Sequence, residues 1–195
     1  MNRHTTVKRR TKETDIQLRL VLDGSGQSKV QTGIGFFDHM LVLWAKHGLF
    51  DLDLKAEGDL HIDAHHTVED VGLALGQALR EALGNKVGLV RYGWCLLPMD
   101  DALARVVLDC GGRPFLAYDT PEDVAPIENF PFQLLEEFLR AFSVQGGHNL
   151  HVALLDGRDS HHMAEAVFKG LGRALDQATQ IDPRVQGVPS SKGML

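Results

Sequence analysis

The chain has 195 residues, 44% of them hydrophobic and 24% charged, a composition typical of a globular protein with one domain or two small halves around one core. Its net charge of −6 argues against nucleic acid as a partner. No apolar run is long enough to cross a membrane, and the basic start, residues 1–15, is not followed by the apolar segment of a secretory signal. Cys95 and Cys110 form no metal-binding or disulfide pattern, so we expect a reducing, cytoplasmic location.

The first half of the chain alternates between strand and helix patterns. The basic start predicts a strand with a solvated face, and residues 16–24 place Ile and Leu at alternate positions, as a half-buried strand does. Residues 36–48 follow a helix pattern, with Gly48 as the expected C-terminal cap. A second alternating segment, residues 50–59, leads to an amphipathic helix that starts at His65.

The second half of the chain repeats this order. Residues 91–119 predict three strands separated by turns, and a helix is expected to begin near Pro131. A strand over residues 149–157 then leads into a helix headed by His161. The last residues, 185–195, have a loop-like composition.

Two helix patterns 96 positions apart share a motif. The segments that start at His65 and His161 are identical at nine of 18 positions, and both begin with His-His-x-x-Glu (the two headers, residues 65–69 and 161–165). The preceding helices align at an offset of 98, which places His39 on Glu137. Two Ala- and Leu-rich helices that resemble each other by chance are the alternative, but chance does not account for two headers.

We therefore expect an internal duplication within a single domain that spans residues 1–195. The predicted fold is α+β, with two similar β-β-α-β-α halves (residues 1–90 and 91–182), helices packed between sheets, and a C-terminal tail (residues 183–195).

The spacing within the headers is that of a metal site. On a helix, residues four apart share a face, whereas neighbours point about 100° apart. The first histidine of each header therefore shares a cation with the glutamate, while the second points elsewhere. If the two helix heads meet about a pseudo-two-fold axis, each cation gains the second histidine of the other head and a fourth ligand from the preceding helix. The expected ligands are His65, Glu69, His162 and Glu137 for one ion and His161, Glu165, His66 and His39 for the other.

Nitrogen and oxygen donors without thiolate suit Mn, Fe, Co, Ni or Zn, and the carboxylates favour the harder ions. The alternative is that the paired histidines are capping or surface residues, which a single pair usually would be. A glutamate beside a second acidic residue, as Glu137 is beside Glu136, is also commonly a solvated side chain.

Five motifs resemble a known family, that of imidazoleglycerol-phosphate dehydratase, a hydro-lyase of histidine biosynthesis. They are RRTKETDI (9–16), GIGFFDHML (33–41), DLHIDAHHTVEDVG (59–72), DGRDSHHMAEAVFK (156–169) and PSSKG (189–193). The resemblance covers nearly the whole chain. It implies a ribosomal protein S5 domain 2-like fold, two Mn²⁺ per subunit, and a homo-oligomer of 24 subunits with sites at subunit interfaces. Several family members have His where this chain has Glu137, which leaves the metal preference of that site open.

The resemblance also implies the reaction. D-erythro-imidazoleglycerol phosphate would lose water to give imidazole acetol phosphate, with two metal ions stabilising an imidazolate intermediate as Lewis acids. Glu13 would act as general acid or base and His47 would face substrate, while Arg91, Arg113, Ser191 and Lys192 would bind the phosphate. The expected catalytic residues are Glu13, His47, Glu69 and Glu165, and His39 is expected to contact substrate as well as metal.

Two other functions fit parts of the pattern. A dinuclear metallohydrolase would use similar ligands, but the two-fold symmetry of the ligand sets and the TKETD segment argue against it. A metal-storage shell would also be rich in histidine, but it gives Arg91, Arg113 and Lys192 no role. Turnover of imidazoleglycerol phosphate to an enolisable ketone separates the dehydratase from both.

Overall fold

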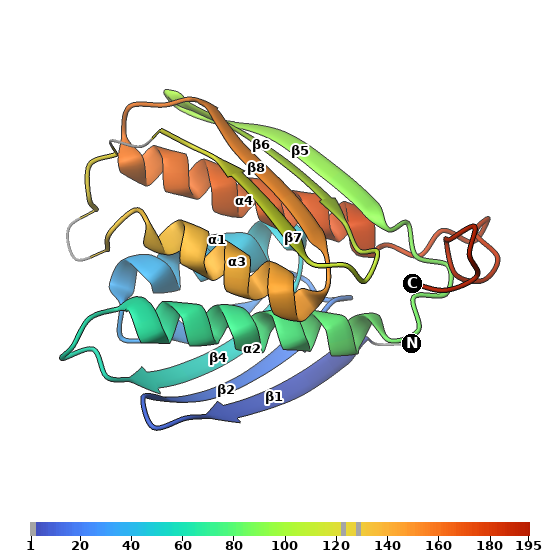
Figure 1. Cartoon of the computed structure of the whole chain (residues 1–195), viewed down its shortest axis with the longest axis horizontal. Helices are drawn as coiled ribbons and strands as arrows, with labels where there is room; N and C mark the ends of the chain where they lie inside the picture. The colour runs from blue at the N-terminus through green and yellow to red at the C-terminus, as the bar shows by residue number, and fades with distance from the viewer. Residues whose placement is uncertain (1–2, 122–123, 128–129) are drawn as a thin grey trace.

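The computed structural model describes residues 3–121, 124–127 and 130–195. In this part of the chain, two four-stranded sheets enclose a layer of four helices (Figure 1). The first half consists of β1 (His4–Arg10), β2 (Thr14–Val21), β3 (Ser28–Gln31), α1 (Gly35–Gly48), β4 (Asp51–Gly58) and α2 (His65–Leu83). The second half consists of β5 (Tyr92–Met99), β6 (Ala102–Asp109), β7 (Phe115–Asp119), α3 (Leu134–Gly146), β8 (Asn149–Asp156) and α4 (Ser160–Thr179).

The two halves have the same topology. The strand orders are β1-β2-β4-β3 and β5-β6-β8-β7, and each sheet contains one parallel pair, β3 with β4 and β7 with β8. Each half has three strands before its first helix, so the predicted β-β-α-β-α order lacked one strand. In the first half that strand is β3, whose four residues are largely exposed and carry no apolar alternation. The α+β fold with two similar halves is confirmed.

The helices pair between the halves, α1 with α4 and α2 with α3. Each pair crosses at a glycine of the second helix. A Cβ on Gly76 would lie 2.5 Å from the main-chain oxygen of Phe142, and a Cβ on Gly172 would lie 2.5 Å from that of Trp44. These contacts are related by the same offsets, 96 and 98, that align the sequence. The duplication therefore extends to the close backbone approach that sets the depth of helix packing.

Two predicted helix boundaries were wrong. The left-handed residue after α1 is Leu49 (φ 56°), not Gly48, which stays in the helix because a Cβ there would strike the Phe50 ring at 2.3 Å. Helix α3 begins at Leu134 rather than near Pro131, and it ends at Gly147 with φ 64°. None of the described helices is long and apolar enough to span a membrane.

Candidate metal centre

The head of α2 is fixed to the first sheet by a buried carboxylate. Asp70 accepts hydrogen bonds from the Arg9 guanidinium (2.7 and 2.9 Å) and from the Thr14 hydroxyl (2.5 Å). Asp63 accepts the main-chain N–H of His65 at 2.8 Å and so supports the first turn. Arg9 and Thr14 belong to the RRTKETDI motif, so this part of the motif holds the first header in place.

The heads of α1 and α4 are held in a similar way. Asp159 caps α4, since its carboxylate accepts the main-chain N–H groups of His161 (2.8 Å) and His162 (3.3 Å). In α1, the Asp38 carboxylate accepts both the N–H and the hydroxyl of Thr32, which fixes the loop before the helix.

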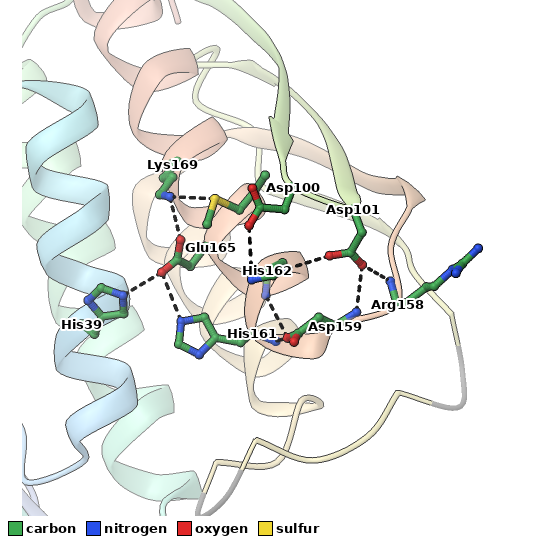
Figure 2. Close-up of polar contacts among 10 residues, drawn as sticks. His39, Asp100, Asp101, Arg158, Asp159, His161, His162, Glu165 and Lys169 are labelled. Carbon is green, nitrogen blue, oxygen red and sulfur yellow. Dashed lines mark hydrogen bonds and ion pairs between the residues drawn. The ribbon is translucent and has the colours of Figure 1, made fainter.

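Three predicted ligands from these two helices converge (Figure 2). His39 Nε2 of α1 lies 2.8 Å from Glu165 Oε1 of α4, and His161 Nε2 lies 3.1 Å from the same oxygen. The ligand atoms of all three side chains lie within 4.8 Å of one another. Two imidazole nitrogens and one carboxylate oxygen at this separation fit a divalent cation with nitrogen and oxygen ligands.

Lys169 joins this cluster, although the sequence gave no reason to single it out. Its Nζ donates to Glu165 Oε2 at 2.6 Å across one helical turn. Burial alone would raise the pKa of the Glu165 carboxyl, but Lys169, His39 and His161 outweigh burial and lower the pKa to about 2. Glu165 is therefore ionised at neutral pH, as a metal ligand must be. The i, i+4 spacing of Glu165 and Lys169 was the available signal.

The second predicted set does not form such a cluster among the described residues. His65, Glu69 and Glu137 are partly buried on α2 and α3, and Gly72 packs on Phe138, so Glu137 lies near the level of the first header. This set has two carboxylates and one imidazole. Without a cation two carboxylates repel each other, whereas His39 and Glu165 attract.

The second histidine of each header turns away from the first. His162 Nδ1 donates to Asp101 Oδ1 at 2.6 Å, and the ring points away from Glu165 (Figure 2). His66 Nδ1 donates to Asp59 Oδ2 at 3.0 Å. Neither imidazole joins the His39 cluster. Within the described chain, the exchange of imidazoles between the two headers is therefore not made, and it stays a prediction for an assembly of chains.

The two headers do share a cavity. A volume of about 1010 Å³ is lined by His39, His65 and His161, with apolar walls that include Phe36 and Phe130. The Phe36 ring meets the His161 ring edge-on at 5.1 Å between centroids. An apolar cavity with a few convergent imidazoles has the character of a small-molecule site.

The two expected acid–base residues lie on different sides of this region. Glu13 is exposed, and its main-chain oxygen accepts the N–H of Asp59 at 3.1 Å, which places it beside the loop that holds His66. His47 lies in the last turn of α1, lining a smaller cavity with Arg173. Burial lowers the pKa of His47, and the charges of Lys169 and Arg173 lower it further.

The four expected phosphate ligands lie at the opposite end of the helices. The main-chain N–H of Arg91 bonds to Ala178, and 17 residues of α4 separate Ala178 from His161, which corresponds to about 25 Å. The Arg91 guanidinium donates to Asp109 (2.6 and 2.9 Å) and to the carbonyl of Pro189 (2.8 Å), so it holds the tail against the domain. Arg113, Ser191 and Lys192 are exposed.

Comparison with known proteins identifies this arrangement. The family model for imidazoleglycerol-phosphate dehydratase matches residues 32–175, which include both headers. The chain belongs to the imidazoleglycerol-phosphate dehydratase family. It is 56% identical to the imidazoleglycerol-phosphate dehydratase of Acetivibrio thermocellus and 54% identical to that of Geobacillus kaustophilus, in each case over the full length of both chains.

Solved dehydratase structures have the same fold. A crystal structure of the imidazoleglycerol-phosphate dehydratase of Staphylococcus aureus matches with a TM-score of 0.82 and 35% identity, over 91% of this chain and 99% of that one. The Pyrococcus furiosus enzyme in complex with (S)-C348 matches with a TM-score of 0.85 and 38% identity, over 97% of this chain and 100% of that one.

Proposed function

We propose that this chain dehydrates D-erythro-imidazoleglycerol phosphate to imidazole acetol phosphate and water in histidine biosynthesis, at a centre with two Mn²⁺ per subunit. The activity follows from membership of the dehydratase family. The observation that carries the metal centre is the convergence of His39, His161 and Glu165 from the two halves of the duplicated fold.

The donor set supports this proposal. His39, His161 and Glu165 hold the first ion, and the pseudo-symmetric His65, Glu69 and Glu137 hold the second. When bound, the two cations act as Lewis acids that stabilise negative charge on the imidazole ring of the substrate. The shared cavity beside His65 and His161 admits that ring, and its apolar walls exclude water, which strengthens every charge interaction inside.

Glu13 and His47 supply the proton transfers in this proposal. The exposed Glu13 carboxylate lies where it can take the proton from the carbon beside the ring or return one to the departing hydroxyl. His47 has a lowered pKa and is neutral at pH 7, so it can accept a proton.

The placement of the phosphate ligands supports sites shared between subunits. Arg91 lies about 25 Å along α4 from His161, which is farther than a small phosphorylated imidazole extends. One chain therefore supplies the metal ligands while the tail and Arg113 of another bind the phosphate. Such head-to-tail contacts generate closed assemblies, and a homo-oligomer of 24 subunits is the state we propose.

The proposal is tested with the purified, Mn²⁺-loaded protein and imidazoleglycerol phosphate. We expect a ketone product, and we expect His161→Ala to lose both turnover and bound metal. His151→Ala is the matched control, because this exposed imidazole on β8 packs against Phe115 outside the cavity. Full turnover in His161→Ala, or metal binding without turnover in the unchanged chain, would overturn the proposal.

A further inference from the structure

Each header presents its second histidine in the same chemical state. Nδ1 of His66 donates to Asp59, and Nδ1 of His162 donates to Asp101. A carboxylate only accepts hydrogen bonds, so the proton of each neutral ring lies on Nδ1 and the lone pair lies on Nε2. About a third of each imidazole side chain remains exposed, 34% for His66 and 29% for His162, so Nε2 is accessible from outside the chain.

The two aspartates do not correspond to each other in the duplication. At the offset of 96 that aligns the headers, Asp59 falls on Leu155. Asp101 lies in the turn between β5 and β6, and the equivalent turn between β1 and β2 carries Glu13 at an offset of 88. The same Nδ1 contact is thus made from two unrelated places in the fold. Inheritance from one ancestral half does not account for it, whereas a shared requirement on the imidazoles does.

We propose that Asp59 and Asp101 are positioning residues that fix His66 and His162 in the tautomer offering Nε2 to a metal ion held by another subunit. The inference rests on the proposed function and adds two residues to it. A carboxylate that accepts the other ring N–H of a metal-binding histidine fixes both its tautomer and its orientation, and loss of such a partner lowers metal affinity 10- to 100-fold.

The surroundings of Asp101 show how its carboxylate is held. Oδ2 accepts the main-chain N–H groups of Arg158 (2.7 Å) and Asp159 (3.0 Å), while Oδ1 faces His162 (Figure 2). In Asp101→Asn, the two main-chain donors retain the amide oxygen, and the amide N–H₂ then faces Nδ1. The His162 proton is expected to move to Nε2, where it blocks metal binding. Asp59 lacks main-chain donors of this kind, so Asp59→Ala is the corresponding change.

The experiment extracts Mn²⁺ from the loaded oligomer with increasing concentrations of a chelator and measures the metal that stays bound. The unchanged chain should release its two ions at similar chelator concentrations. Asp101→Asn and Asp59→Ala should each release one ion at a chelator activity at least tenfold lower, and crystals of each variant should show the weakened ion at a different one of the two sites. The double variant should weaken both ions.

Asp51→Asn is the matched control. The Asp51 carboxylate also accepts main-chain N–H groups, those of Ser25 and Gln27, but it contacts no histidine. Two ions retained as in the unchanged chain by both aspartate variants would overturn the inference and leave the proposed function intact. Fewer than two ions in the unchanged chain would instead overturn the proposed function. If Asp101→Asn fails to assemble, Asp59→Ala decides alone.

Discussion

His39 Nε2 on α1 and Glu165 Oε1 on α4 lie 2.8 Å apart, although 126 residues separate them in the chain. This contact joins the two halves at the end of the helix layer where both headers begin. We expect His39→Ala and Glu165→Gln each to lower turnover by about 100-fold or more, because each removes one of three converging donors. Metal content and turnover measured on the same preparations test this, and an active Glu165→Gln enzyme with its full metal content would contradict it.

Replacing Glu137 with His should change the metal preference of the second site. The ligand set would then be two imidazoles and one carboxylate, as in the His39 cluster, and the repulsion between Glu69 and Glu137 would be removed. Imidazole favours Zn²⁺ over Mn²⁺ more than carboxylate does. Competition between the two ions, followed by metal analysis, should therefore show a higher zinc to manganese ratio in Glu137→His. An unchanged ratio would mean that Glu137 is not a ligand.

Truncation after Gly187 should raise KM for imidazoleglycerol phosphate by about tenfold or more while metal content stays the same, since a phosphate held by several charge-assisted hydrogen bonds loses two of its donors. The truncation removes Ser191 and Lys192 together with the Pro189 carbonyl that Arg91 holds. Arg184→Ala is the control, because Arg184 lies just before the cut and pairs only with Asp182 in the described contacts. An unchanged KM in the truncated chain would refute a phosphate role for the tail.

The glycines at the two helix crossings should be needed for stability. An alanine at Gly172 would place its Cβ 2.5 Å from the main-chain oxygen of Trp44, and backbone cannot move aside as a side chain can. We expect Gly172→Ala and Gly76→Ala each to lower the free energy of unfolding by about 2 kcal/mol, as overpacked cores do. Gly35→Ala has open space and a helical position, so its melting temperature should be unchanged or higher. Equal melting temperatures for all three variants would contradict this account of the crossings.

His148 should make the protein less stable in acid. Burial lowers the pKa of this fully enclosed imidazole to about 4, and neither ring nitrogen has a hydrogen-bond partner. A histidine whose pKa is lower in the folded state contributes no pH dependence above about 6.5, and its folded form loses stability as the pH falls towards 4. The expected loss is about 2 kcal/mol at pH 5 relative to pH 7.

Denaturant unfolding of the unchanged chain and of His148→Leu at both pH values isolates this contribution. The difference in unfolding free energy between the two proteins should shift in favour of the variant at pH 5. A constant difference would mean that the imidazole becomes protonated without opening the core.

The sequence predicted the functional residues of the duplicated helices better than their partners. Both headers begin helices, and the pairing of His161 with Glu165 follows directly from the helical repeat. The contact of His39 with that pair was expected from the alignment of α1 with α3. The partner of each second histidine was not expected, because Asp59 and Asp101 come from a loop and a turn whose positions depend on the whole fold.

Two other differences have local causes. Strand β3 was missed because its partner β4 supplies the order that its own sequence lacks. Gly48 was taken as a cap because glycine usually ends helices, whereas here its lack of a side chain serves the crossing with Gly172 and the contact with Phe50. In both cases tertiary packing, which a single segment does not reveal, decided the outcome.

Anomalous scattering from crystals grown with Mn²⁺ tests the central claim most directly. The account predicts two ions per chain, one bound by His39, His161 and Glu165 and the other by His65, Glu69 and Glu137, each completed by His66 or His162 from another subunit. A single ion, or two ions bound without any residue of the paired headers, would contradict it.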